Sequence, residues 1–314
     1  MNEYRKLTDE EFFSIAPVLA RYGIHDSAEV SRFIDSKLDK IYDVYLLHKG
    51  TKSILKKTTS TQRDKSVYAY YFKDHGFAVP EVLSSFSAGE EHYVQMEFVE
   101  GTDARGCNAA EGKRIGEALA DIQSYYLTEG GRTETSEAYY NKQIGRHINA
   151  IKPFYPEYSA VFDIVKHRFF EVPHTLIHDD FLPINVLLND EDICIIDWEF
   201  ANIQPYFLDL GRFAFIYDKD NRLFISKESS DAFLKGYYQR MQRNSEFHIT
   251  EEEFKQDVVI SAFCQYVLFV GGSINKTAEK SSEAIPESID NDYLKNIMQR
   301  LRDMNRNSKF NWKI

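Results

Sequence analysis

The sequence predicts an α+β protein with a strand-rich N-terminal part and a mainly helical C-terminal part. Within the first hundred residues, short runs of β-branched and aromatic residues are separated by turn-forming residues, a pattern typical of strands and tight turns. From Ala109 onward, apolar residues recur three and four positions apart, which indicates amphipathic helices. The period changes at Glu100-Gly101, so we expect an N-terminal lobe over residues 1–100 and a C-terminal lobe over residues 101–314.

The N-terminal elements follow from local signals. Thr8 and Glu11 have the spacing of a capping box, which predicts that a helix begins there. Gly76 and Pro80 end a second helix. The expected order is a helix over 8–35, strands over 41–47 and 53–56, a helix over 62–75, and strands over 82–86 and 92–98.

The C-terminal elements are mostly helices that enclose a few short strands. We expect helices over about 109–126, 138–150 and 156–170, strands over 175–177, 186–188 and 193–196, and helices with one acidic loop after Leu208. The apolar stretch from Val258 to Val270 is interrupted by polar residues and is shorter than the roughly 20 residues of a membrane span, so we interpret it as a buried helix.

Composition excludes several classes of protein. With 43% hydrophobic and 28% charged residues, the chain has the composition of a globular protein and not of a disordered one. The net charge of −11 argues against nucleic acid as a partner, because binding a phosphate backbone requires clustered cations. The cysteines (Cys107, Cys194 and Cys264) are odd in number and widely spaced, and no targeting segment is visible. These features predict reduced thiols and a cytoplasmic location without membrane association.

The chemistry is concentrated in two neighbouring segments. Asp180 and Asn185 lie five residues apart in a loop between apolar strands, and Asp197 ends the strand that follows a turn at Asn189-Asp190. A hairpin brings its two ends together, so Asp197 should lie close to Asn185. Phosphoryl transfer requires such oxygen-bearing side chains, one to accept the hydroxyl proton and others to hold Mg²⁺ on the phosphates. The structural alternative is that each residue only forms a turn.

These segments resemble a known family. The pattern His178-x-Asp180-x₄-Asn185, followed by Ile196-Asp197-Trp198-Glu199, is similar to that of the aminoglycoside phosphotransferase and choline kinase superfamily, which has a two-lobed protein-kinase-like fold. The resemblance implies that Asp180 is the catalytic base and that Asn185 and Asp197 bind Mg²⁺. It also implies a nucleotide-binding lobe over 1–100 and a helical lobe over 101–314 with the catalytic loop and the acceptor site.

The resemblance extends to the nucleotide. Lys56 in the strand Ile54-Leu55-Lys56 matches the lysine that contacts the ATP phosphates, whereas Lys57 would point to the opposite face. The backbone of Glu97 and Val99 matches the hinge that pairs with adenine. ATP is the expected donor, and GTP remains an alternative.

Four features depart from the family pattern. The helix glutamate that pairs with the lysine is missing, since the expected positions hold Lys65, Ser66 and Val67, and the nearest acid is Asp64. The loop over 36–42 has no glycine. A common Leu-His pair is Ile122-Gln123, and Asp179 replaces a common glycine.

The expected function is therefore an ATP-dependent small-molecule kinase that phosphorylates a hydroxyl of a small cationic acceptor, of the aminoglycoside type or the choline and ethanolamine type. Candidate acids for the acceptor site are Glu199, Glu251, Glu252, Glu253, Glu279, Glu283, Glu287, Asp290 and Asp292. A catalytically weak or inactive kinase-like binding protein is the alternative. A protein kinase is disfavoured, because the motifs are not H-R-D and D-F-G.

Overall fold

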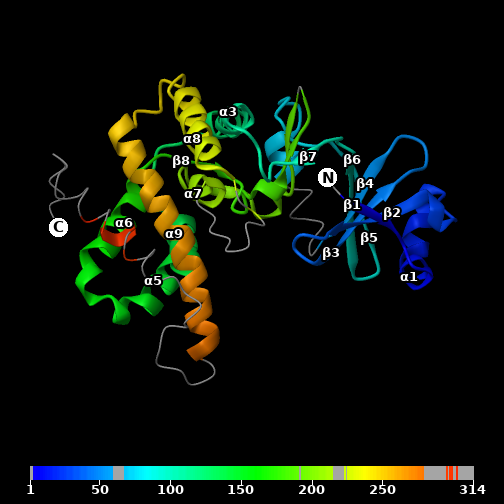
Figure 1. Cartoon of the computed structure of the whole chain (residues 1–314), viewed down its shortest axis with the longest axis horizontal. Helices are drawn as coiled ribbons and strands as arrows, with labels where there is room; N and C mark the ends of the chain where they lie inside the picture. The colour runs from blue at the N-terminus through cyan, green and yellow to red at the C-terminus, as the bar shows by residue number, and fades with distance from the viewer. Residues whose placement is uncertain are drawn as a thin grey trace. The chain divides into compact units, whose positions relative to one another are not determined.

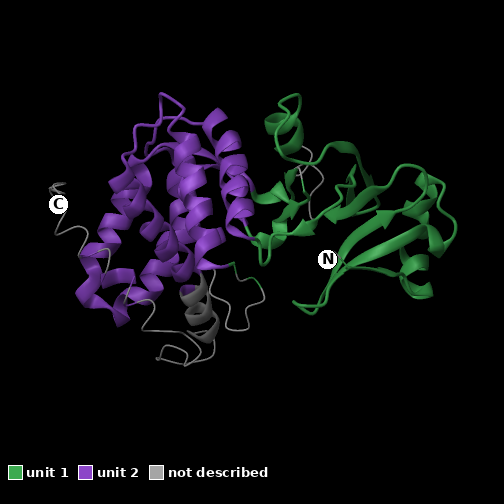
Figure 2. Ribbon diagram, turned by 45° about the horizontal axis from the view of Figure 1, so that its top comes forward, with its two compact units in different colours: residues 1–107, 182–200, 217–225 green, residues 108–181, 201–216, 226–314 purple. Residues whose placement is uncertain are grey.

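The computed structural model describes residues 3–58, 67–190, 192–214, 223, 225–278, 295, 297–299 and 302 (Figure 1). The chain forms two compact units, coloured separately in Figure 2. The first unit comprises residues 1–107, 182–200 and 217–225, and the second comprises residues 108–181, 201–216 and 226–314. The first change of unit, after Cys107, lies close to the expected boundary at Glu100-Gly101. The assignment of two lobes at that boundary stays a prediction.

The first unit is built on a six-stranded antiparallel sheet. Its spatial order is β1-β2-β3-β4-β6-β5, and neighbouring strands are antiparallel throughout. The strands are β1 (Glu3–Lys6), β2 (Val30–Asp35), β3 (Lys40–Leu47), β4 (Ser53–Thr58), β5 (Val82–Ala88) and β6 (Glu91–Glu97) (Figure 1). The prediction of a strand-rich N-terminal part is confirmed, and β1 is an additional strand that the sequence pattern did not reveal.

Helix α1 (Asp9–Leu19) contributes apolar side chains to a core on one face of this sheet. Ile15 and Leu19 belong to this core together with sheet residues that include Leu55 and Tyr93. The capping box is confirmed, because the Thr8 hydroxyl accepts a hydrogen bond from the Glu11 N–H and the Glu11 carboxylate accepts one from the Thr8 N–H. The apolar residues of α1 therefore stabilise one face of the sheet.

The prediction of a helix over 8–35 is wrong beyond Tyr22. After α1, a short 3₁₀ turn (Ala20–Tyr22) ends at Gly23, whose φ of 68° is left-handed and stops the helix. Residues 30–35 form β2, paired on both sides with β1 and β3. For residues 30–35, hydrogen bonding to two neighbouring strands outweighs the helix that the local apolar periodicity favours.

The first unit also contains a π-helical turn and a small three-stranded sheet. Of the helix expected over 62–75, the structure describes residues 67–75. Tyr68–Phe72 form a π-helical turn within this segment. The small sheet has the order β10-β9-β7, from β7 (Thr102–Asp103), β9 (Val186–Leu188) and β10 (Ile193–Ile195). The predicted hairpin is confirmed, with β9 and β10 antiparallel.

The second unit is mainly helical, as predicted. Its helices are α3 (Ala109–Tyr125), α4 (Glu134–Tyr139), a π-helical segment (Tyr140–Gly145), α5 (Arg146–Ile151), α6 (Ser159–Glu171), α7 (Leu208–Ala214), α8 (Lys227–Met241) and α9 (Glu251–Ala278). A two-stranded antiparallel sheet joins β8 (His174–Ile177) to β11 (Asn202–Pro205). Helix α9 packs against α5 and α7. The expected acidic loop over 279–292 lies outside the described residues.

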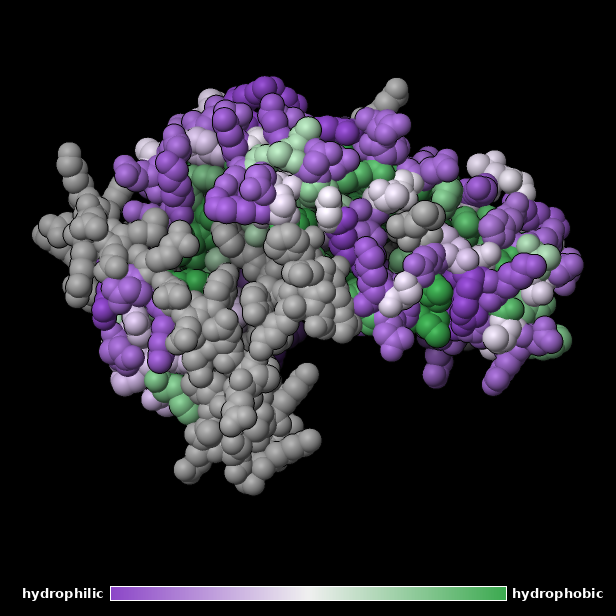
Figure 3. All heavy atoms as spheres, viewed as in Figure 1, coloured by the Kyte–Doolittle hydropathy of each residue, from purple (hydrophilic) through white to green (hydrophobic). Residues whose placement is uncertain are grey.

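The described surface is mostly hydrophilic on the face seen in Figure 3, with hydrophobic residues visible between the charged ones. The cysteines Cys107, Cys194 and Cys264 are all buried and unbridged, as expected of reduced thiols. Among the helices of the described residues, none has the length and apolar character needed to cross a membrane.

Close packing of α3 on α8 depends on glycines. A Cβ atom at Gly116 would lie 2.2 Å from the Phe233 carbonyl oxygen, and one at Gly112 would lie 2.5 Å from the Ser229 carbonyl oxygen. Both contacts are with backbone, which cannot move aside as a flexible side chain can.

We therefore expect Gly116→Ala to lower the free energy of unfolding by about 1–3 kcal/mol, because the clash exceeds the gain in helix propensity of about 0.5–1 kcal/mol. Urea denaturation measures this change. Gly131→Ala is the control, because a Cβ atom there meets nothing within 4 Å. Equal stability of the two variants would contradict the close packing.

Candidate active site

Strand β4 directs Lys56 away from the α1 core. Leu55 is fully buried in that core, whereas Ile54 and Lys56 both line a cavity on the other face, as the two-residue period of a strand requires. Lys57 points with Leu55 and pairs with the exposed Glu91. Lys56 therefore faces the cavity and Lys57 faces the opposite side of the sheet, in agreement with the predicted choice of Lys56.

The Lys56 ammonium group lies between two carboxylates. Its Nζ donates to Asp197 Oδ1 at 2.5 Å and to Glu199 Oε2 at 3.2 Å. The side chain of Lys56 is 16% exposed, so the ammonium group requires anionic partners in place of water. The pairing with Glu199 was not predicted, because Glu199 was considered only as an acid for the acceptor site.

The β9–β10 hairpin places Asn185 beside Asp197. Asn185 immediately precedes β9, Asp197 follows β10 by two residues, and the Ile196 N–H donates to the Asn185 carbonyl at 2.9 Å. Both side chains line the same cavity as Lys56. Asp197 has a φ of 67°, a left-handed conformation that is rare outside glycine and typical of strained functional positions.

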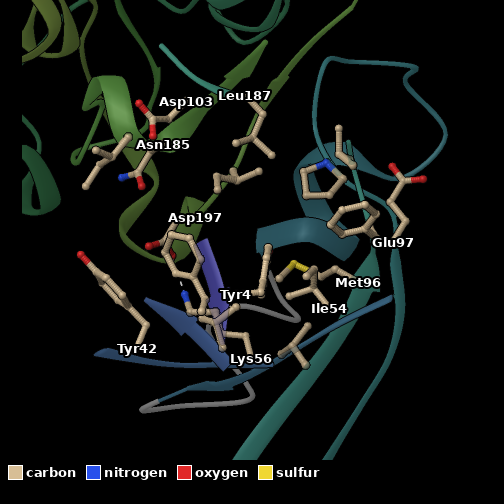
Figure 4. A pocket seen from close by; sticks show the side chains of 18 of the residues that line it. Tyr4, Tyr42, Ile54, Lys56, Met96, Glu97, Asp103, Asn185, Leu187 and Asp197 are labelled. Atoms are coloured by element: carbon tan, nitrogen blue, oxygen red, sulfur yellow. Dashed lines mark hydrogen bonds and ion pairs between the residues drawn. The ribbon is translucent and has the colours of Figure 1, made fainter. Parts of the chain in front are cut away.

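This cavity has a volume of about 140 Å³ and is lined by residues of the first unit. A single water needs only about 10–15 Å³ on the same measure, so the cavity has room for a larger ligand. In Figure 4, Asn185, Asp197 and the tip of Lys56 lie on one side and Glu97 lies on the other. The apolar lining consists of Tyr4, Phe33, Tyr42, Val44, Ile54, Tyr68, Pro80, Val94, Met96, Phe98, Val99, Ile184, Leu187 and Ile196.

The expected hinge residues also line the cavity. Glu97 is bound to Glu81 twice, because its N–H donates to the Glu81 carbonyl and its carboxylate accepts the Glu81 N–H. Within the described residues, neither backbone group of Val99 has a hydrogen-bond partner. Val99 therefore offers the edge of the cavity a backbone donor and an acceptor.

A buried ion-pair cluster at the same cavity was not predicted. Arg105 donates to Asp35 at 2.8 Å and to Asp103 at 2.6 Å, and all three side chains are nearly inaccessible. Asp35 also accepts the backbone N–H groups of Lys37 and Leu38 at 3.0 Å, which closes the turn between β2 and β3. The loop over 36–42, which has no glycine, is therefore held by hydrogen bonds to the Asp35 carboxylate. No local pattern signals that Arg105 would be its partner.

Asp180 lies in the second unit and has two neighbours that orient it. Its carboxylate is paired with Arg212 of α7, and its backbone N–H donates to Nδ1 of the fully buried His178 at 3.2 Å. The hydrogen bond to His178 holds the backbone of the loop that carries Asp180. The pairing of Arg212 with Asp180 was not predicted. The sequence offered one signal for it, because Arg212 lies one helical turn after Asp209 in α7.

Two further carboxylates beside Asp180 are buried. Asp209 accepts the backbone N–H groups of His178 and Asp179, at 2.7 and 3.0 Å, and a side-chain donor from Gln123 at 3.0 Å. Gln123 thus holds the loop where the family pattern has a histidine. Burial raises the pKa of Asp209 to about 7. Burial also raises the pKa of Asp179 to about 6, although the Tyr139 hydroxyl, which donates to it at 2.6 Å, opposes the shift.

The candidate acids for the acceptor site are only partly described. Glu199 is paired with Lys56, Glu251 with Lys255, and Glu253 caps α9 through Thr250. Glu252 is exposed. Glu279, Glu283, Glu287, Asp290 and Asp292 lie outside the described residues, as does Asp64.

The fold is that of kinase-like phosphotransferases. A choline/ethanolamine kinase family protein from Mesorhizobium loti matches with a TM-score of 0.60 at 16% sequence identity, over 96% of each chain. Amicoumacin kinase hAmiN, in complex with AMP-PNP, Ca²⁺ and Ami, matches with a TM-score of 0.55 at 13% identity, over 94% of this chain and 96% of that chain. The predicted fold class is confirmed.

The family model of the phosphotransferase enzyme family, APH, matches residues 68–243, more than half of the chain. The chain therefore belongs to this family of phosphotransferases, as predicted. A stretch of 94 residues is 32% identical to Protein LicA from Haemophilus influenzae. That match spans 29% of this chain and covers about a third (32%) of the length of LicA.

The raised pKa of Asp179 predicts how stability depends on pH. The folded state holds a proton on Asp179 that the unfolded state releases near pH 3.8, so the free energy of unfolding falls as pH rises from about 4 to about 6. Asp179→Asn removes this titration, tolerates the φ of 65° and keeps an acceptor for Tyr139. We expect the decrease in stability across this range to be smaller in the variant, by roughly 2–3 kcal/mol.

Urea denaturation at several pH values measures the difference. Asp74→Asn is the matched control, because Asp74 also has a left-handed φ (66°) but is exposed. If the free energy of unfolding of Asp179→Asn and of the native protein fell equally with pH, the prediction of a raised pKa for Asp179 would be wrong.

Proposed function

We propose that the protein is an ATP-dependent kinase that transfers the γ-phosphate to a hydroxyl of a small cationic molecule. Asp180 accepts the hydroxyl proton, Asn185 and Asp197 hold Mg²⁺, Lys56 neutralises phosphate charge, and the backbone of Glu97 and Val99 pairs with the base. The observation that carries the proposal is the cavity in which Lys56, Asn185 and Asp197 line the same space as the hinge residues.

The cavity has the composition that a nucleotide requires. One part of the lining is apolar and aromatic, which suits a planar base, and the charged residues suit phosphates and a cation. The backbone of Val99 supports base pairing, because its groups are available. Glu97 would contribute its carbonyl oxygen, since its N–H is already used. ATP is the proposed donor, with GTP as the alternative.

The residues fit a magnesium ion. Asn185 and Asp197 supply oxygen donors, and Mg²⁺ is usually held by one or two protein oxygens together with phosphate oxygens and waters. Within the described residues there is no cluster of three or more His, Cys, Asp or Glu side chains that would form an all-protein site. When bound, the ion would neutralise charge on the phosphates.

Asp180 is suited to the role of base. Its side chain is 24% exposed, so it is accessible to an acceptor hydroxyl. Arg212 orients the carboxylate, and His178 holds the Asp180 backbone N–H. The carboxylate of Asp179 adds negative charge beside it, which favours a cationic acceptor. Aminoglycoside-type and choline or ethanolamine-type acceptors both satisfy this chemistry. The reduced cysteines and the need for ATP favour a cytoplasmic location.

Replacing the base should separate chemistry from binding. We expect Asp180→Asn to lower turnover by 100-fold or more, because a general base contributes about 10²–10⁴-fold, and to leave nucleotide affinity nearly unchanged. Steady-state kinetics measures the first effect and calorimetry with ADP the second. Asp190→Asn, in the exposed β9–β10 turn, is the control. Near-native turnover of Asp180→Asn would contradict the assignment.

The experiment that tests the whole proposal is Mg²⁺-dependent release of ADP or GDP with a panel of acceptors. The panel contains aminoglycosides, choline, ethanolamine, and hydroxylated amino acids and sugars. We expect one cationic class to stimulate release in the native protein and not in Asp180→Asn. Stimulation by a neutral acceptor alone would contradict the cationic preference. Nucleotide binding without transfer to any acceptor would favour the alternative of a kinase-like binding protein.

A further inference from the structure

Among the described residues, Asp197 and Glu199 are carboxylate neighbours of Lys56, and Asp197 has a second role in the proposed function. Asp197 Oδ1 lies 2.5 Å from Lys56 Nζ, and Asp197 is also a proposed magnesium ligand. A carboxylate that turns to a divalent cation interacts less with a neighbouring ammonium group, because the two cations compete for the same oxygens. Glu199 Oε2, at 3.2 Å from Nζ, is then the carboxylate that still holds Lys56.

The inserted helix does not supply this partner in its described part. Residues 67–72 read Val-Tyr-Ala-Tyr-Tyr-Phe and contain no acid. Their contact with the hairpin is aromatic instead, because the ring centroid of Phe72 lies 4.7 Å from that of Trp198. An apolar contact thus joins this helix to the segment that bears both carboxylates.

The backbone that carries Glu199 is anchored by its neighbour. It lies in a 3₁₀ turn (Trp198–Phe200) whose first residue, Trp198, is fully buried and donates from Nε1 to the Ile195 carbonyl at 2.9 Å. The Glu199 side chain is 20% exposed, close to the 16% of Lys56. Because this backbone is anchored, only the side chains of Glu199 and Lys56 have to be ordered when they pair.

We propose that Glu199 is a positioning residue for Lys56, taking the place of the helix glutamate that is missing from this sequence. Glu199 holds the Lys56 ammonium group toward the cavity while Asp197 serves the metal. This inference rests on the proposed function, since it assumes that Lys56 contacts phosphate. Glu199 acts through Lys56 and does not itself contact the nucleotide or the ion.

The test measures nucleotide affinity in place of turnover. The variants are Lys56→Met, Glu199→Gln, Glu199→Asp, the double variant Lys56→Met/Glu199→Gln, Asp64→Asn and Glu91→Gln. Calorimetry gives the affinity for ADP with and without Mg²⁺, and a magnesium titration gives the midpoint for the metal. Glu91→Gln is the matched control, because it removes the carboxylate partner of Lys57 on the opposite face of β4.

We expect Lys56→Met and Glu199→Gln each to weaken ADP binding by about tenfold, as the loss of one partner of a partly buried ion pair would. The double variant should bind no more weakly than Lys56→Met, because Glu199 acts through that lysine. Glu199→Asp should recover part of the affinity. Asp64→Asn and Glu91→Gln should bind as the native protein does.

Several results would overturn the inference. They are native affinity in Glu199→Gln, an effect that adds fully to that of Lys56→Met, a tenfold loss in Asp64→Asn, or a shifted magnesium midpoint in Glu199→Gln, which would make Glu199 a metal ligand. If Lys56→Met itself binds normally, the role of Lys56 in the proposed function fails and this inference fails with it. If only Glu199→Gln binds normally, the proposed function stands.

Discussion

A partly buried ammonium group determines the organisation of the first unit. Lys56 lies on an internal strand of the sheet, and with 16% of its side chain exposed it cannot rely on water for solvation. Its partner Asp197 is 141 residues further along the chain, so the pairing requires the β9–β10 hairpin to pack with the N-terminal sheet. Together with the pairing of β9 with β7, this ion pair joins residues 182–200 to the first unit, although the chain on either side belongs to the second.

Two carboxylates of the functional segments are held in strained backbone. Asp179 in the second unit and Asp197 in the first have φ values of 65° and 67°. A non-glycine residue in this region costs of the order of 1–3 kcal/mol, and the surroundings must offset that cost. Trp198 supplies burial next to Asp197, and Asp209 supplies two hydrogen bonds to the backbone around Asp179. The buried neighbours of each strained residue therefore help to hold these two carboxylates in place.

Local periodicity in the sequence was sufficient to predict much of this architecture. A period of two assigns Lys56 and Lys57 to opposite faces, and a hairpin turn places Asn185 near Asp197, so these features follow from residues close together in the chain. The strand at 30–35 could not be predicted in that way, because its stability comes from pairing with β1 and β3. The ion pairs Arg105–Asp35, Arg212–Asp180 and Lys56–Glu199 escaped prediction for the same reason, since each joins segments that are distant in sequence.

The turn between β2 and β3 shows how a missing motif can be replaced by different chemistry. A glycine-rich loop binds phosphate through backbone N–H groups that point at the ligand. Here the N–H groups of Lys37 and Leu38 already donate to Asp35, whose carboxylate is in turn neutralised by Arg105. These two N–H groups are therefore already paired with an anion that belongs to the chain. In the proposed function these two N–H groups do not receive the phosphates, and Lys56 and the magnesium ion balance the phosphate charge.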